Sequence, residues 1–407
     1  MLVAAATAVS IAFLANPGIY QPYLEGAAYL QIAQGHPEAT YSYYAGRVLH
    51  PFAVRVLADT FSMDLQRAFF VSAVISLLAL CVFLSLYLRK RSLTPAFLPV
   101  LVCVPAMVML YRGYYFHDLF HAMLVAAFFL AYSYSAWIAL PILFLLHWTR
   151  ESTILLSGCL AVISLRRRDW ALALAVALVA AFGMDMTSIA AHSALPNKHG
   201  LNALEMYALK VPYDFCNNFL GLVFWTDTNA STLSFSPKWV VNIPGHLGSI
   251  HQVGFCGFHP SMILHTLAAF LIPFGIGPGI AARMIREGRR ALPQYDCVFQ
   301  TAFAYGITCL MLAPVIGVWP ERYVLYAWPL FWLALPELLK PLTFDHVQTI
   351  ILIALHSAAC VVGFLSFGRS GFIQFAMLMI LMVLNIAAYY FLKSIQYQIM
   401  GQDAPQV

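Results

Sequence analysis

Apolar runs about as long as a membrane span follow one another along almost the whole chain. A helix needs about 20 largely apolar residues to cross the roughly 30 Å of hydrocarbon in a bilayer. Segments that approach this requirement lie at 1–15, 66–88, 93–111, 119–134, 136–148, 152–165, 170–191, 259–282, 297–318, 322–339, 347–367 and 371–393. The pattern predicts an all-α integral membrane protein with about 12 transmembrane helices, within a range of roughly 10–13.

The composition excludes an ordinary soluble domain. Of the 407 residues, 62% are hydrophobic and only 10% are charged, whereas a soluble domain carries roughly 25% charged residues. The net charge of +5 is modest and is not gathered into a basic face, so we expect membrane lipids and no nucleic acid as partners. We expect one transmembrane bundle over residues 1–393, followed by a cytoplasmic tail at 394–407.

Lysine and arginine gather in alternate loops. They follow the second, sixth, eighth, tenth and last predicted spans, as Arg89, Lys90, Arg91, Arg166, Arg167, Arg168, Arg283, Arg286, Arg289, Arg290, Lys340 and Lys393. With twelve spans, all of these clusters fall on one side, and loops rich in basic residues stay in the cytoplasm. Both termini are therefore expected in the cytoplasm.

Two long segments fall on the opposite side. Residues 16–64 mix Tyr, His, Arg and Pro with short apolar stretches, which is typical of helices that lie along the interface. Residues 192–258 contain Trp, Tyr, Gly and Pro and are expected to form a small external cap. Cys216 and Cys256 lie in this cap, where an oxidising compartment permits a disulfide; the pairing is left open.

Acidic, basic and histidine side chains gather in four external segments, although charge near lipid is costly. They are Glu25, His36, Glu38, Arg47, His50, Arg55, Asp59, Arg112, His117, Asp118, His121, His147, Arg150, Glu151, Glu321 and Arg322. A carboxylate there can remove a proton from an attacking hydroxyl, and arginine can hold a phosphate. Apolar walls between helices can hold a lipid tail. The pattern indicates a transferase site for a lipid-phosphate donor at the outer membrane boundary.

The first external segment resembles a known family. The stretches Tyr23–Tyr29, Ala33–Gly35 and Tyr44–Pro51 are similar to the first external loop of GT-C type glycosyltransferases. These are multi-span enzymes that take a sugar from a polyprenyl-phosphate carrier. Weaker similarities lie at Trp148–Ser152 and at Glu321–Tyr323 ahead of Trp328-Pro329. The resemblance covers the architecture of about the first 330 residues and rests on short motifs.

The resemblance implies an inverting transfer to a glycan or lipid hydroxyl at the periplasmic face of a bacterial inner membrane. The implied catalytic residues are Glu25 and Asp118. Donor phosphate binding falls to Arg322, Arg47 and His50, and the cavity is shaped by His117, Arg150, Glu151 and Glu321. Glu25 replaces the Asp that is common in the family, and the second external loop has no Asp-x-Asp pair. We therefore expect a metal-independent enzyme with no cofactor beyond the lipid-linked sugar.

Each of these residues also has a purely structural interpretation. Glu25 can be a solvated carboxylate at a helix start, Asp118 a helix N-cap, and Arg322 a partner of Glu321. Arg47 and His50 can pack against lipid headgroups.

Other functions remain open as well. An O-antigen ligase or polymerase would depend instead on Lys198, His199, His246 and His251. A lipid or solute transporter would carry mid-membrane charges and broken helices, and Asp185 is the clear mid-span charge. A catalytically inactive protein of the same fold is a further alternative.

Overall fold

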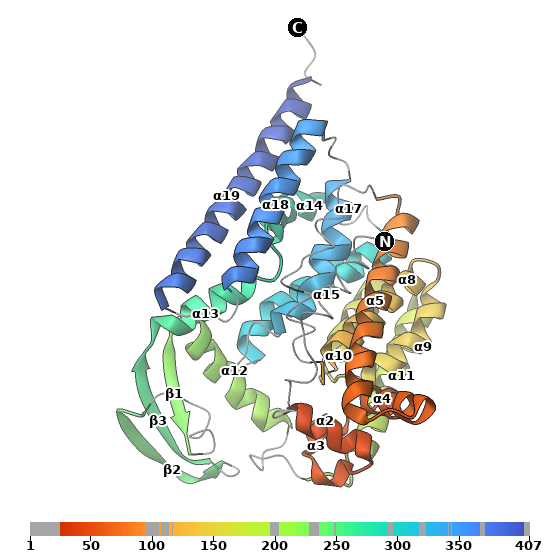
Figure 1. Ribbon diagram of the computed structural model, residues 1–407, viewed down its shortest axis with the longest axis vertical. Coiled ribbons are helices and arrows are strands. Elements are labelled where there is room, and N and C mark those ends of the chain that lie inside the picture. Colours follow the sequence, from red (N-terminus) through yellow and green to blue (C-terminus); the bar gives the residue numbers. More distant parts are fainter. Residues whose placement is uncertain are drawn as a thin grey trace.

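The computed structural model describes residues 25–93, 106, 114–115, 117–195, 203–227, 236–247, 250–291, 296–316, 323–340, 342, 344–366 and 371–402. The predicted span 1–15 and nearly all of 93–111 lie outside these residues. Figure 1 shows a helical bundle around α5, α8 and α15, a sheet at the lower left, and the α18–α19 pair rising beside it.

Short helices fill the described part of the first external segment, as the sequence predicted. They are α2 (Glu25–Gln34), η1 (Pro37–Ala39), α3 (Ser42–Ala45) and α4 (Leu49–Phe61). Helix α4 exposes Phe52 and Phe61, at 63% and 65%, while its opposite face packs on α5. Exposed aromatic side chains on a short helix suit a position along the membrane interface.

The first half of the bundle follows the predicted apolar runs closely. Its helices are α5 (Leu65–Lys90), α8 (Asp118–Tyr132), α9 (Ala136–His147), α10 (Thr153–Arg166) and α11 (Trp170–Ala190). Asp64 is the N-cap of α5: its carboxylate accepts a hydrogen bond from the backbone N–H of Arg67 at 2.9 Å. Helix α8 packs against both α5 and α9, and α10 packs against α11.

The cap region contains a sheet, so the all-α prediction is wrong there. Helix α12 (Ala203–Leu220) leads into β1 (Leu222–Thr226), β2 (Trp239–Leu247) and β3 (Ile250–Phe258), which form an antiparallel sheet with the order β1-β3-β2. Gly221 makes the turn into β1 with φ +65°, and a Cβ there would lie 2.9 Å from the His259 carbonyl oxygen. The structure does not join Cys216 to Cys256.

The predicted span 259–282 is broken into two helices. They are α13 (Pro260–Leu271) and α14 (Gly277–Ala291), and the break contains Pro273 and Gly275, the latter at φ +59°. Asn385 closes the break from α19: its Nδ2 donates to the Gly275 carbonyl at 3.1 Å, and its Oδ1 accepts from the Gly279 N–H at 2.7 Å. The Asn385 amide therefore satisfies backbone groups that the break leaves without helical partners.

The remaining elements are α15 (Cys297–Ile316), η4 (Leu325–Ala327), η5 (Leu330–Ala334), α17 (Leu335–Leu339), α18 (His346–Ser366) and α19 (Gly371–Gln402). Helix α15 packs on α10, α12 and η5. Helix α19 continues to Gln402, so the predicted boundary between bundle and tail at residue 394 falls inside a helix. The apolar part of α19 that could cross a membrane ends at Ile395, so the predicted boundary stays a prediction.

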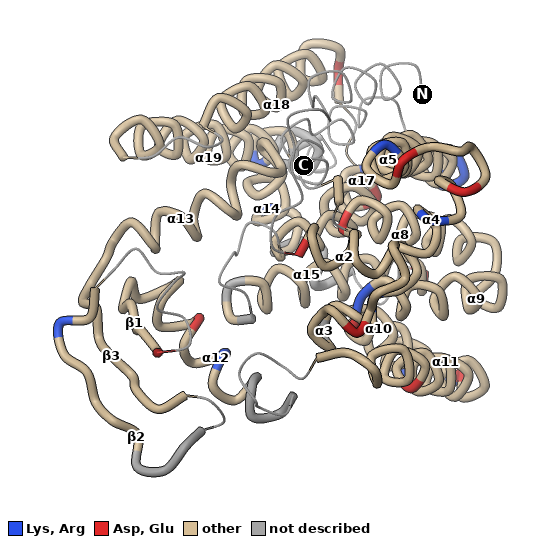
Figure 2. Tube along the Cα trace, turned by 60° about the horizontal axis from the view of Figure 1, so that its bottom comes forward, with Lys and Arg blue, Asp and Glu red and all other residues tan. Residues whose placement is uncertain are grey.

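Four described helices are long and apolar enough to cross a membrane: Leu65–Lys90, Trp170–Ala190, His346–Ser366 and Gly371–Ile395. They indicate a membrane protein, but the prediction of about 12 spans is not confirmed. Six further apolar helices have 10–17 residues. At 1.5 Å per residue α8, for example, is only about 22 Å long, which is short of a full crossing. Figure 2 shows how few charged residues the helices carry between their ends.

The role of Asn385 leads to a first prediction. Replacing Asn385 with Leu removes the partners of Gly275 and Gly279, and each buried group left unpaired costs about 1–3 kcal/mol. We expect a clear fall in the apparent Tm of the purified protein in detergent. Ser394→Ala on the exposed face of the same helix is the matched control. An Asn385→Leu protein as stable as wild type would contradict this role.

Candidate functional site

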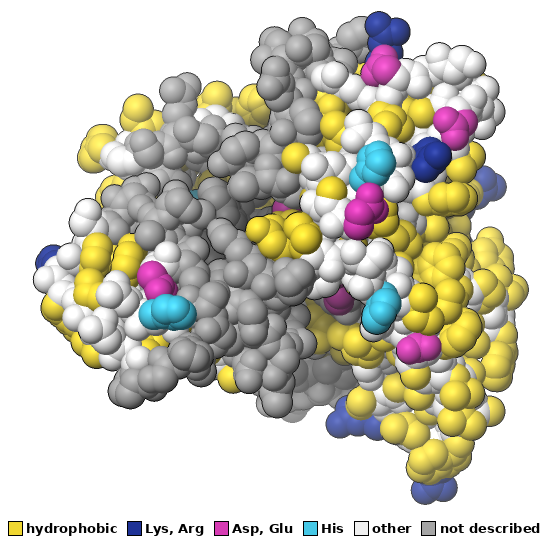
Figure 3. Space-filling view, turned by 90° about the horizontal axis from the view of Figure 1, so that it is seen from below, with side chains coloured by type: hydrophobic (Ala, Val, Ile, Leu, Met, Phe, Trp, Pro, Cys, Tyr) yellow, Lys and Arg dark blue, Asp and Glu magenta, His cyan; other side chains and the backbone are white. Residues whose placement is uncertain are grey.

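Those of the external residues singled out above that the structure describes lie at one end of the molecule. Figure 3 looks at this end, where α2, α3 and α4 lie: acidic and histidine side chains are scattered over it, while the flank at the right is largely hydrophobic. The residues come from α2, the turn before α4, the start of α8 and the turn between α9 and α10. Segments separated by up to about a hundred residues in the sequence therefore meet here.

Asp118 and Arg150 form a buried ion pair at this end. Arg150 Nη1 donates to Asp118 Oδ1 at 2.9 Å, and the two residues are only 3% and 5% exposed. The Tyr326 hydroxyl donates to the same carboxylate oxygen and accepts from the same guanidinium nitrogen. Arg150 Nη1 also lies 3.1 Å from His117 Nε2. Because each charge has an opposite charge in contact, this pair is tolerated inside an apolar bundle.

Arg150 uses only one of its three guanidinium nitrogens for hydrogen bonds to described residues. Every hydrogen bond that Arg150 makes in the described part of the chain uses Nη1, so Nε and Nη2 have no partner there. The guanidinium carbon lies 4.2 Å from the centre of the Tyr326 ring and 5.2 Å from that of Tyr323. Two aromatic rings and the ion pair thus hold the Arg150 guanidinium in place. Its Nε and Nη2 can still donate hydrogen bonds to an anionic ligand.

His121 is held in one tautomer beside this pair. Thr149 donates its hydroxyl proton to the Leu146 carbonyl at 2.6 Å, so its oxygen accepts from Nδ1–H of His121 at 2.7 Å. Nε2 of His121 is then a hydrogen-bond acceptor, and it is buried with no partner. The imidazole meets the Tyr326 ring edge to face at 5.5 Å.

A second ion pair joins the interfacial helices to the bundle. Arg47 Nε donates to both carboxylate oxygens of Glu151 at 3.0 Å, and Nη1 donates to the Tyr29 hydroxyl at 2.8 Å. Burial opposes the charge on Arg47, but attraction to Glu151, Tyr29 and Glu25 outweighs burial and raises the pKa of Arg47 well above its usual value. The Tyr29 ring meets the His117 ring edge to face at 5.2 Å, which links the two ion pairs.

Glu25 and His50 occupy different environments at the edge of this network. Glu25 is the first residue of α2 and is half-buried. His50 is only 1% exposed and packs against the rings of Phe69 and Phe120. Burial lowers the pKa of His50 to about 3, although the charge of Asp118 works in the opposite direction. His50 is therefore neutral at neutral pH, and any contact with a phosphate would be a neutral hydrogen bond.

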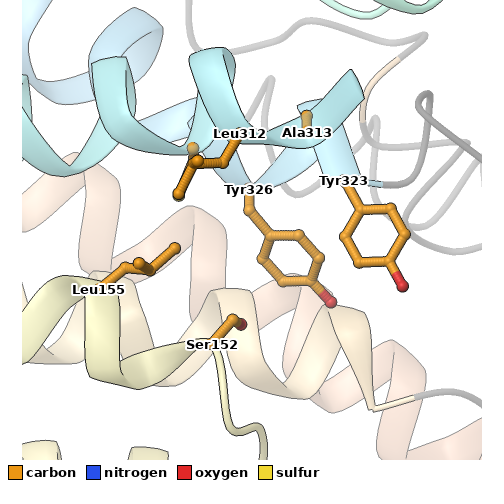
Figure 4. A pocket seen from close by; sticks show the side chains of 7 residues that line it. Ser152, Leu155, Leu312, Ala313, Tyr323 and Tyr326 are labelled. Atoms are coloured by element: carbon orange, nitrogen blue, oxygen red, sulfur yellow. The ribbon is translucent and has the colours of Figure 1, made fainter. Parts of the chain in front are cut away.

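A small apolar pocket borders the Asp118–Arg150 pair. It lies between α10 and α15 and is lined by Ser152, Leu155, Cys309, Leu312, Ala313, Tyr323 and Tyr326. Figure 4 shows the Tyr326 ring projecting toward Ser152, with Leu155 and Leu312 along the wall. An apolar wall beside a buried cation suits a ligand that has both an anionic and a hydrocarbon part.

The structure brings most of the predicted site residues together. Glu25, Arg47, His50, His117, Asp118, Arg150 and Glu151 all belong to this end of the molecule. Glu321 and Arg322 lie outside the described residues. The alternative reading of Asp118 as an N-cap is wrong, because His117 holds that position and Asp118 is the first residue of α8.

Sequence reasoning missed Tyr29, Thr149 and Tyr326, which are uncharged and gave no charge signal. Tyr29 follows Glu25 by four positions, a spacing that places two side chains on one helix face. Of the alternative set for a ligase, Lys198 and His199 lie outside the described residues, and His246 belongs to β2. His251 is an exposed residue of β3. Asp185 is exposed near the end of α11 and does not face the network.

Comparison of the chain with protein-family models, with curated proteins and with solved structures finds no match. The described residues hold no group of three or more His, Cys, Asp and Glu side chains placed to bind a metal ion.

The buried pair gives a second prediction. Arg150→Met leaves the Asp118 carboxylate buried without its cation, and breaking such a pair costs about 3–5 kcal/mol. The double variant Arg150→Met with Asp118→Asn should recover part of the loss, because neither charge remains unpaired. Apparent Tm values of both single variants and the double variant complete the cycle. Strictly additive losses would show that the two side chains do not depend on each other.

His50 gives a third prediction, on pH. Since the folded state lowers the pKa of His50 from 6.5 to about 3, its contribution to stability is complete above pH 6.5 and is lost as the pH falls toward 3. We expect the apparent Tm to fall between pH 7.5 and pH 5, and to fall less steeply in His50→Gln. His36→Gln, at an exposed histidine, should follow the wild-type curve. Equal slopes in all three proteins would be evidence against this assignment.

Proposed function

We propose that the protein is a membrane glycosyltransferase that moves a sugar from a polyprenyl-phosphate donor to a hydroxyl of a glycan or lipid acceptor. The observation that carries the proposal is the buried Arg150, which is neutralised by Asp118 through Nη1 and keeps Nε and Nη2 available beside an apolar pocket. A phosphate ester of a long hydrocarbon chain has the two parts that this surface can bind. The resemblance of the first external segment to GT-C enzymes points the same way.

The reaction is an inverting displacement in this proposal. Glu25 takes the proton of the acceptor hydroxyl, whose oxygen forms a new bond to the anomeric carbon of the sugar. The bond between that carbon and the phosphate oxygen breaks, and the electron pair leaves with polyprenyl phosphate. Arg150 stabilises the charge that develops on the phosphate, with Arg322 and Arg47 as further candidates. The site lies at the periplasmic face of a bacterial inner membrane, with both termini in the cytoplasm.

Asp118 has a positioning part in this scheme. Its carboxylate accepts hydrogen bonds from Arg150 and Tyr326 and is only 5% exposed, so an acceptor hydroxyl has little access to it. Glu25 is more accessible, so we assign the proton transfer to Glu25 and the orientation of Arg150 to Asp118. The reaction is proposed as metal-independent because the second external loop lacks an Asp-x-Asp pair.

The test is sugar transfer from a panel of radiolabelled polyprenyl-phosphate sugars by the purified protein in lipid, with membrane extract as acceptor. We expect Glu25→Gln to lose about 10²–10⁴-fold in rate and Arg150→Gln about 10²–10³-fold. Asp118→Asn and Arg322→Ala should also be impaired. Asp59→Asn, at a carboxylate whose side chain is 76% exposed, is the matched control.

Transfer that survives in all four variants would exclude this site as the seat of the reaction. Failure of the wild type with every donor would reject the transferase and leave two functions. One is a ligase or polymerase that takes a preassembled, lipid-linked glycan.

The other is transport, which one observation favours. Transporters place discontinuous helices at their binding sites, and α13 and α14 form such a break. The break is closed by the Asn385 amide, which leaves its backbone groups less available to a substrate. We therefore rank transport second. Uptake of a labelled solute into proteoliposomes in the absence of sugar transfer would reverse this order.

A further inference from the structure

Helix α12 buries polar side chains and exposes apolar ones, which is the reverse of the pattern in a helix on a water-soluble cap. Its buried face carries Asp214, Asn217 and Asn218, at 0%, 1% and 1% exposure. Its exposed face carries apolar residues at 37–45% exposure, namely Leu209, Val211, Phe215, Phe219 and Leu220. A helix in water buries its apolar stripe, so this arrangement indicates that α12 turns its apolar face to lipid and its polar face to the protein interior.

The polar face of α12 has acceptors without partners in the described part of the chain. Both carboxylate oxygens of Asp214 and the amide oxygen of Asn217 are buried there with no hydrogen-bond donor. Asn217 Nδ2 donates to Asn218 Oδ1 at 3.3 Å, so the amide oxygen of Asn217 is left over. Positions 214 and 217 are one helical turn apart, which places these oxygens on one face. The helix is fixed there, since the Tyr213 hydroxyl donates to the Phe224 carbonyl of β1 at 2.9 Å.

Asp214 has no cation in direct contact among the described residues. The elements that make the most contacts with α12 are α13, α15 and β1, and their sequences contain no acidic or basic side chain and one histidine, His265. Lys210 lies one turn earlier on α12 and its charge acts on Asp214, but it forms no ion pair with the carboxylate among the described residues. A buried carboxylate whose oxygens have no direct partner is among the most costly groups to bury. Its two oxygens are therefore open to a directly bound ligand.

We propose that Asp214, together with the amide oxygen of Asn217, binds a small monovalent metal cation at the buried face of α12. Carboxylate and amide oxygens are ligands for hard cations. One carboxylate balances one positive charge, whereas a divalent ion would leave a net charge in the interior. Buried acidic residues in membrane helices commonly mark ion sites. This site goes beyond the proposed glycosyltransferase function and does not depend on it.

The test is the apparent Tm of the purified protein in detergent at pH 8, titrated with LiCl, NaCl or KCl. Choline chloride keeps the ionic strength constant. We expect a saturable rise of roughly 2–4 °C with at least one of the metal ions. The rise should vanish in Asp214→Asn and persist in Asp185→Asn, which removes an exposed carboxylate from α11. At pH 5 the rise should shrink, because protons compete for the same oxygens.

A second variant and a second measurement cover the case in which Asp214→Asn does not fold. Asn217→Leu keeps the carboxylate and removes one ligand oxygen, and we expect it to weaken binding of radioactive ²²Na⁺ to the purified protein at least several-fold. No stabilisation and no ²²Na⁺ binding by the wild type would overturn the proposal, as would a rise of unchanged size in Asp214→Asn. Stabilisation by acid alone, with no response to any metal ion, would identify Asp214 as a neutral carboxylic acid and also overturn it.

Discussion

The candidate site depends on the contact between Arg150 and Asp118. Burying either charge alone in an apolar bundle would cost a large free energy of desolvation. The pair is tolerated because each charge neutralises the other. Asp118 begins α8, Arg150 lies in the turn between α9 and α10, and Tyr326 follows α15, so one contact fixes three parts of the chain. Glu151 is the neighbour of Arg150 and points to a different partner, Arg47. The first pair thereby also positions the interfacial helices.

Ion pairs also join helices at the opposite end of the bundle. Arg91 pairs with both Asp296 and Glu337, which joins the end of α5 to the start of α15 and to α17. The Lys340 ammonium group donates to the Arg91 carbonyl at 3.1 Å. Sequence analysis assigned Arg91 and Lys340 only to the orientation of the protein in the membrane. Their contacts show that basic residues in such loops also connect helices.

The apolar runs predicted most helices to within a few residues, as at 66–88 for Leu65–Lys90 and 347–367 for His346–Ser366. Hydrophobicity does not report where a helix breaks, so the split at Gly275 was missed. The strands were missed because Gly254 and Gly257 interrupt β3 in a stretch rich in turn residues. Alternating loops placed the external charges in one group, and the described members of that group do lie at one end of the molecule. Which of them touch depends on packing that the sequence does not display. Tyr326 in particular is uncharged, so a selection based on charged residues does not find it.

Two carboxylates of one site can take different roles when their surroundings differ. Asp118 is buried and accepts hydrogen bonds from Arg150 and Tyr326, so its carboxylate holds the guanidinium in place and is hard for an acceptor hydroxyl to reach. Glu25 begins α2, is half-buried, and interacts with Arg47 through charge. A glutamate reaches one methylene further than an aspartate, which suits a base that must extend from an interfacial helix toward a hydroxyl at the membrane boundary. In a transferase of the proposed kind, the Glu found where the resemblance leads one to expect Asp would therefore shift the acceptor outward, while Arg150 keeps the donor phosphate at the bundle.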